Sequence, residues 1–145
     1  MESIAMKVTT IYAAQILGYL TAKEEPLATA KEIVAQVGVT YQYCMKILNE
    51  MRHAGLLVSE QGCRGGFRLG KAAEKISLYD VVSLFERDYA KLHGRAFLPD
   101  DSFSRVMGYI LEIEAEKMKH LTIREIYSCD KCRLKMLVES CGQEI

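Results

Sequence analysis

Apolar residues recur at helical spacing in the first half of the chain. The first run has apolar side chains three or four residues apart and stops before Glu24, so it predicts a helix with one buried stripe, made by Val8, Ile11, Tyr12, Ile16, Tyr19 and Leu20. A shorter helix should follow, with Thr29 as its N-cap and Glu32 as the capping-box partner. Gly38 ends this second helix.

A third helix starts directly after this glycine. Thr40 can cap it, and apolar residues repeat on one face as far as Gly55, at Cys44, Ile47, Leu48 and Met51. Two short helices joined by a tight glycine turn are typical of a helix-turn-helix.

The next segment has the pattern of a β-hairpin. Residues 56–58 and 67–69 predict two short strands around a glycine-rich tip at 61–66, which together form a wing. Ser77 then opens another helix, with Asp80 at capping-box spacing.

The second half carries one long apolar helix after a polar connection at residues 86–101. From Phe103 to Leu121, its apolar face is broader than a small winged domain can bury. The surplus predicts a dimer seam formed by Met107, Ile110, Leu111 and Ile113. The predicted fold is mainly α, with a winged helix-turn-helix domain at 1–87, a connector and dimerisation helix at 88–127, and a cysteine-containing tail at 128–145.

The outward face of the third helix offers groups that can recognise DNA. Gln42 and Asn49 can pair with adenine edges. Lys46 and Arg52 can bind guanine or phosphate, and Tyr41 offers a hydroxyl for phosphate. An ordinary solvated helix face is the alternative, because most surface helices have a polar outer face.

The wing favours the DNA interpretation. It places Arg64 in a flexible glycine-rich turn, and a narrow minor groove attracts an inserted arginine. A hairpin turn alone is common, but a helix-turn-helix followed at once by this wing is a specific pattern. The predicted DNA-binding residues are Thr40, Tyr41, Gln42, Lys46, Asn49, Arg52, Arg64, Gly65, Gly66 and Arg68.

Composition and charge refine this picture. The 145 residues are 50% hydrophobic, enough to build a core without disulfides. The formal net charge is zero, yet residues 38–71 hold five basic residues and two acidic ones, so an anionic partner should meet the first half. We expect a cytoplasmic protein, because we see neither an apolar run long enough to span a membrane nor a secretory signal.

The tail contains a cysteine pattern, C-x2-C-x8-C, made by Cys129, Cys132 and Cys141. Such spacing can bind zinc or an iron–sulfur cluster, with a fourth ligand from His120, His93 or a second subunit. A thiol switch and unremarkable free thiols are the two other interpretations.

The three histidines lie far apart in the sequence, without a partnered nucleophile or acid–base pair. We therefore expect no catalytic residues and no enzyme activity.

Several stretches of the first half together resemble one family. Residues 27–86 resemble the Rrf2 family of winged-helix transcription regulators, whose members include iron–sulfur, cysteine-metabolism and nitric-oxide regulators. The resemblance rests on Lys31-Glu32-Ile33-Val34, Gly38-Val39-Thr40, residues 47–57, Arg64-Gly65-Gly66-Phe67-Arg68-Leu69 and residues 76–82. The long helix and the run at 121–126 resemble the dimerisation region of that family.

The resemblance implies a homodimer with two recognition helices in successive major grooves and wings in the flanking minor grooves. Cluster-bearing members have three cysteines between the helix after the wing and the dimerisation helix, and residues 86–103 contain none. Those cluster ligands therefore cannot be carried over to this chain.

The leading hypothesis is a homodimeric DNA-binding regulator, a repressor of a palindromic operator that senses redox, metal or iron–sulfur status through its second half. The alternative is a small cysteine-based metal or redox protein whose winged domain binds proteins.

Overall fold

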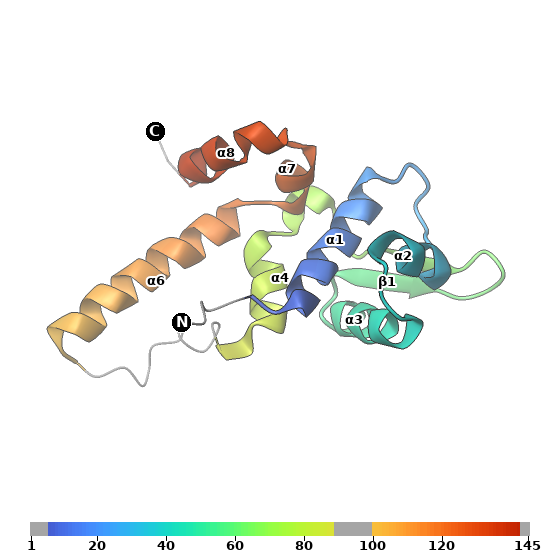
Figure 1. The fold of residues 1–145 in the computed structure, drawn as a ribbon, viewed down its shortest axis with the longest axis horizontal. Coiled ribbons are helices and arrows are strands. Elements are labelled where there is room, and N and C mark those ends of the chain that lie inside the picture. The colour runs from blue at the N-terminus through green and yellow to red at the C-terminus, as the bar shows by residue number, and fades with distance from the viewer. Residues whose placement is uncertain (1–5, 89–99, 143–145) are drawn as a thin grey trace.

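The protein folds into a winged half and a helical arm (Figure 1). The structure, a computed structural model, describes residues 6–88 and 100–142. The winged half contains α1 Val8–Ala22, α2 Ala30–Val37, α3 Tyr41–His53, β1 Leu57–Glu60, β2 Gly66–Leu69, the short 3-10 turn η1 Ala73–Lys75 and α4 Leu78–Phe85. The second half contains α6 Ser102–His120, α7 Ile123–Ser128, η2 Lys131–Arg133 and α8 Leu134–Ser140. The predicted fold class, mainly α with a winged helix-turn-helix and a long helix, is confirmed.

The helix-turn-helix packs around a core that matches the predicted apolar stripes only in part. In α1 the predicted residues Ile16 and Leu20 are buried, but Val8 and Ile11 are 55% and 43% exposed, so this part of the predicted stripe is wrong. Ile16 and Leu17 of α1 meet Ile33 of α2 and the inner face of α3, and all these side chains are fully buried. The four α3 residues predicted to face inward are buried: Cys44, Ile47, Leu48 and Met51. Gly38 ends α2 with a φ of 77°, a conformation that glycine adopts without strain.

Local capping explains where these helices begin. Thr29 and Thr40 each accept a backbone hydrogen bond at the start of α2 and α3. Ser77 and Asp80 form the complete capping box predicted for α4.

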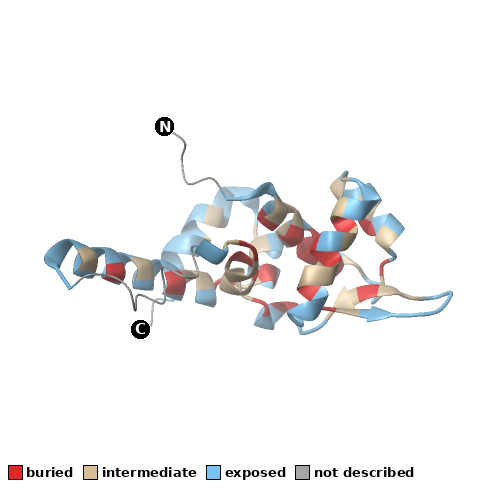
Figure 2. Cartoon of the chain, turned by 90° about the horizontal axis from the view of Figure 1, so that it is seen from below, coloured by how far each residue is buried: buried red, intermediate tan, exposed pale blue. Residues whose placement is uncertain are grey.

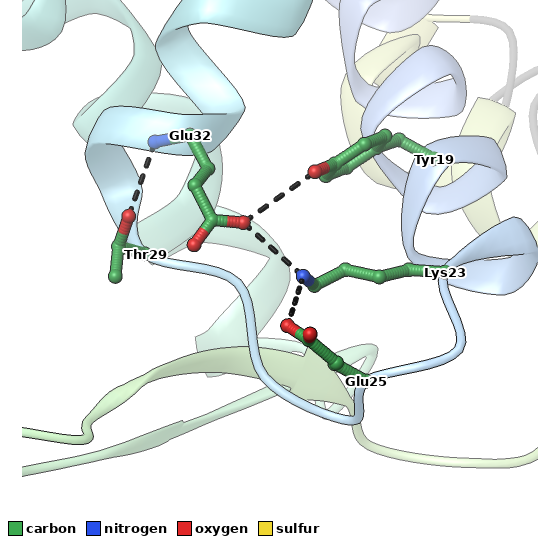
Figure 3. Close-up of polar contacts among 5 residues, drawn as sticks. All are labelled: Tyr19, Lys23, Glu25, Thr29 and Glu32. Carbon is green, nitrogen blue, oxygen red and sulfur yellow. Dashed lines mark hydrogen bonds and ion pairs between the residues drawn. The ribbon is translucent and has the colours of Figure 1, made fainter.

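One capping prediction is wrong. Glu32 does not reach back to the α2 N-cap, because its carboxylate accepts from Lys23 Nζ at 3.2 Å and from the Tyr19 hydroxyl at 3.5 Å (Figure 3). Lys23 also binds Glu25, at 3.1 Å. The Lys23 side chain at the end of α1 thus binds the Glu32 carboxylate in place of the α2 N-cap backbone.

The wing is a two-stranded antiparallel sheet, with Leu57 opposite Leu69 and Glu60 opposite Gly66. Its first strand begins one residue later and runs two residues further than the sequence pattern predicted. Ala28 extends the sheet through two backbone hydrogen bonds with Phe67, of 2.9 and 2.8 Å. A side chain at Gly66 would collide with the backbone of Ala28, so this glycine allows the close approach.

After α6 the chain returns to the winged half. The Ile123 amide donates to the Ile76 carbonyl at 2.8 Å, the Leu78 amide donates to the Leu121 carbonyl at 2.7 Å, and the Ile123 side chain is fully buried in the core of the first half. Helix α7 starts with a Thr122–Glu125 capping box and packs against α1. Residues beyond position 87 therefore complete the core of the winged half.

Gly18 and Tyr127 form the closest part of this α1–α7 contact. A Cβ atom added at Gly18 would lie 2.6 Å from the Tyr127 ring, so only glycine leaves room for that ring.

The arm, made of α6 and α8, is packed more loosely than the winged half. Figure 2 shows mostly exposed and intermediate residues along α6. Gly108 and Ala115 are the buried residues of α6, and α8 has none. No helix in the described ranges is both long and apolar enough to cross a membrane.

Candidate nucleic-acid interface

Helix α3 presents a polar outer face because its apolar residues turn inward. Tyr41 is 57% exposed. Gln42, Lys46 and Arg52 are also exposed, while Asn49 is partly covered. The structure therefore brings the predicted α3 residues onto one accessible face, with Thr40 at its start.

The wing tip carries an exposed arginine on a tight turn. Gly62 has a φ of 108°, and the Gly65 amide donates to its carbonyl at 3.0 Å. This turn leaves Arg64 exposed. Arg68 differs, because its guanidinium binds Glu60 across the two strands at 3.0 Å. A DNA contact by Arg68 would compete with this pair.

The basic groups of α3 and of the wing tip are available for a ligand. Within residues 6–88 and 100–142, Lys46, Arg52 and Arg64 have no ion pair or hydrogen bond to another side chain.

Cys44 lies on the buried face of α3. Burial raises the pKa of its thiol, which keeps the thiol neutral. Cys44 is therefore a packing residue.

Contacts from outside the helix-turn-helix hold α3 in place. The hydroxyls of Thr9 and Tyr43 are 2.5 Å apart, and Tyr12 meets the Tyr43 ring edge-on. Glu86 accepts from the Lys7 amide at 2.7 Å and from the Thr10 hydroxyl at 2.8 Å. Its carboxylate thereby accepts from the backbone N–H of the α1 N-cap residue, as the N3 side chain of a capping box does.

The sequence analysis missed these contacts because Lys7 and Glu86 are 79 positions apart. Neither residue belongs to a local motif, so no short-range signal could have paired them.

This arrangement can be compared with known proteins. The model of the Rrf2 family, described as iron-dependent transcriptional regulators, matches residues 6–139. The chain belongs to the Rrf2 family. Two curated relatives each match over 81 residues: protein aau3 of Rhizobium meliloti (strain 1021) is 38% identical, and a protein of Aquifex aeolicus (strain VF5) whose name describes an HTH-type transcriptional regulator is 32% identical.

Each match to these curated relatives covers 56% of this chain, and the chain spans about half of their length, 53% and 56%. A solved structure of CymR, the global cysteine regulator of B. subtilis, has a TM-score of 0.69 over 90% of this chain and 100% of that one. At 20% sequence identity, this match shows that the two proteins share a fold.

The family description raises the question of an iron site in this Rrf2 protein. Cys129 ends α7, Cys132 lies exposed in η2, and the thiol of Cys141 lies 3.1 Å from the Val138 carbonyl. No three His, Cys, Asp or Glu side chains in the described part of the chain are grouped so that they could hold a metal ion. Residues 6–88 and 100–142 of one protomer therefore do not provide a donor set that fits iron, zinc or a cluster.

Two histidines were predicted as a fourth ligand. His120 Nδ1 is 2.7 Å from the Glu116 carbonyl, and His93 lies outside the described residues. A metal or redox role of the three tail cysteines stays a prediction.

The predicted dimer residues lie on α6. Ile113 is 60% exposed, Ile110 43% and Met107 38%, while Leu111 is partly buried. This placement leaves an apolar face of the Rrf2 protein open to solvent.

Proposed function

We propose that this Rrf2 protein is a homodimeric, DNA-binding transcription regulator, a repressor without catalytic activity that acts on chromosomal DNA in the cytoplasm. The observation that carries the proposal is the exposed α3 face, on which Lys46 and Arg52 have no partner in the described structure, with Arg64 similarly free at the wing tip. Unpaired cations can neutralise phosphates or bind guanine without first breaking an internal ion pair.

The dimer follows from the open face of α6. Two copies that cover Ile110 and Ile113 against each other would remove these side chains from water. A two-fold axis would then present two α3 helices to half-sites roughly 34–36 Å apart or a multiple of that distance, which requires a palindromic operator.

The test is selection of bound duplexes from a random pool, followed by affinity measurements at several salt concentrations. We expect a palindromic site and an affinity that falls steeply with salt, because each phosphate contact releases counterions. Binding without salt dependence, or failure to select any duplex, would favour the alternative, in which the winged domain binds proteins.

The contact residues are tested on the selected duplex. Lys46→Ala and Arg64→Ala should each weaken binding by about 1–3 kcal/mol, the range for a lost base contact. Lys135→Ala is the matched control, because Lys135 lies in α8 of the tail. Variants at 46 and 64 that bind like the parent would refute this interface.

We further propose that the tail is the sensory element, through reversible oxidation of Cys129, Cys132 and Cys141 or through a metal site that a second subunit completes. Lys131 and Arg133 lie next to these cysteines in the chain, and nearby cations favour the reactive thiolate. The tail directly follows α7, which packs on α1, so a change in the tail has a path to the winged half.

A triple Cys129/Cys132/Cys141→Ser variant tests the sensor. We expect the DNA affinity of the parent to change between reducing, oxidising and metal-supplemented buffers, and that of the variant to stay constant. Identical behaviour of both proteins, together with a parent that carries no metal, would show that the tail does not sense.

A further inference from the structure

A cleft opens between the first turn of α1, one flank of α3 and the end of α4. Its volume is about 380 Å³, within the range of clefts that hold small molecules. The Thr9–Tyr43 hydrogen bond lies in its wall. Next to the cleft, the Lys7 amide donates to the Glu86 carboxylate, and this hydrogen bond fixes the start of α1 to the end of α4.

Positively charged residues outnumber negatively charged ones in the lining of the cleft. Lys7, Lys46 and Arg87 supply three positive charges, and Glu50 supplies one negative charge. Lys46 and Arg87 have no ion-pair partner among the described residues, and Lys7 Nζ reaches only the Phe85 carbonyl, at 3.5 Å. Like charges gathered in one cleft repel each other, and a bound anion would relieve that repulsion.

Besides Thr9, Tyr43 and the charged residues, the lining is apolar. Ile47 and Phe85 are buried, and Leu84 is partly buried and packs against the core. A bare inorganic ion would leave this apolar surface unused. The lining therefore fits an anionic group that is attached to an apolar portion.

We propose that this cleft binds a small organic anion, with its carboxylate or phosphate group at Lys46 and Arg87 and its apolar portion against Leu84 and Phe85. Lys46 also lies on the proposed DNA-binding face, so the bound anion would compete with DNA for that side chain. This second part rests on the proposed function, whereas binding to the cleft does not.

A phosphate of the DNA backbone is the other possible source of the same anionic group. The free anion is favoured because Glu50 lines the cleft and Glu86 adjoins it. Two carboxylates would repel a backbone that carries many charges more strongly than they would repel a single anionic group.

Phenyl phosphate is a suitable probe, since it joins a phosphate to an apolar ring. Calorimetric titration of the full chain without DNA should show saturable binding below about 10 mM. Inorganic phosphate should bind about tenfold more weakly because it leaves the apolar lining exposed. The ionic strength is matched with chloride throughout.

Substitutions locate the site. Arg87→Gln and Lys46→Gln should each weaken phenyl phosphate binding about tenfold, through loss of a charged hydrogen-bond donor. Arg133→Gln and Lys135→Gln in the tail should bind like the parent. Unchanged affinity in both cleft variants, or no saturable binding by the parent, would overturn the proposal.

Competition is measured on the selected duplex. Phenyl phosphate should weaken DNA binding by the parent at constant ionic strength, and Arg87→Gln should retain the parent affinity for DNA while losing this response. If Arg87→Gln weakens DNA binding as much as Lys46→Gln does, the cleft holds a backbone phosphate and the free-anion proposal is wrong. A parent that binds phenyl phosphate but no duplex would refute the proposed function and leave the anion site standing.

Discussion

The winged half and the arm both contain helices with apolar residues at helical spacing, but these helices are packed very differently. Ile16, Ile33 and Leu48 of the winged half are fully buried, and the buried cluster extends from α1 to α4. The 19 residues of α6 include two buried ones, Gly108 and Ala115. The winged half thus buries most of its apolar residues within one chain, with Val8 and Ile11 as exposed exceptions, whereas the arm leaves Phe103 and Ile113 largely exposed. Apolar residues at helical spacing therefore need not form a core within the same chain, and in the arm they leave a surface that the proposed dimer would cover.

The strongest test compares two leucines, one from each region. Leu48→Ala should lower the free energy of unfolding by about 2–5 kcal/mol, because it removes a fully buried side chain and leaves a cavity. Leu137→Ala, in α8, should cost less than about 1 kcal/mol, since α8 has no buried residue. Urea unfolding measures both. Equal losses would show that the arm has a core of its own.

A charge on α6 tests whether the arm is an interface. Ile110→Glu should raise the dissociation constant of the dimer at least about hundredfold, because the new carboxylate would be buried without a partner. Sedimentation velocity at micromolar concentration measures the change, with Lys135→Glu as the control. A variant that stays dimeric, or a parent that is monomeric, would contradict this use of the arm.

The joint between the two regions can be tested at Gly18. Gly18→Ala should destabilise the protein by about 1–3 kcal/mol, because the new methyl group collides with the Tyr127 ring. In a Tyr127→Ala background the same substitution should be neutral or slightly stabilising, because alanine favours the helix more than glycine does. A cycle of four thermal or urea unfolding experiments gives the coupling. If the cost of Gly18→Ala is the same in both backgrounds, α7 does not press on α1 at this point.

The smallest effect concerns the ion pairs at the end of α1. The hydrogen bond from Lys23 holds the pKa of Glu32 below its ordinary value, and the hydrogen bond to Glu25 raises the pKa of Lys23. A lowered carboxyl pKa in the folded state stabilises the protein above the unfolded-state pKa, and this stabilisation disappears as the pH falls through the lowered value.

In a carboxyl NMR titration, Lys23→Gln should move the pKa of Glu32 upward, while Lys135→Gln should leave it unchanged. No movement in the Lys23 variant would show that the contact in Figure 3 is not maintained in solution.

The sequence predicts the fold well wherever short-range chemistry decides it. Thr40 and Ser77 begin helices because their side chains accept backbone hydrogen bonds three residues ahead, and Gly38 ends α2 through its left-handed backbone. Burial of the α3 apolar stripe then fixes the outward direction of Lys46, although its contact with DNA stays a prediction.

Long-range contacts could not be predicted in the same way. The Glu32 carboxylate could bind either the α2 N-cap backbone or Lys23, and only the folded chain brings Lys23 close enough to bind it. The return of Ile123 to the core joins residues 47 positions apart at Ile76, and no periodicity encodes such a pairing. The cleft could not be predicted for the same reason, because Lys46 lies in α3 and Arg87 follows the end of α4.

The burial of Ile123 also affects how the protein acquires its structure during synthesis. The core made by residues 13–85 stays incomplete until Ile123 has left the ribosome. Translation at about 5–20 residues per second takes roughly 2–8 seconds to cover the 38 residues from Glu86 to Ile123. During this interval the apolar surface that Ile123 later covers is exposed, and nascent chains that stall there are open to aggregation. Two ribosome-bound chains can be compared by limited proteolysis, one stalled with Ile123 inside the exit tunnel and one stalled with Ile123 beyond it. We expect protection of the winged half only in the second chain.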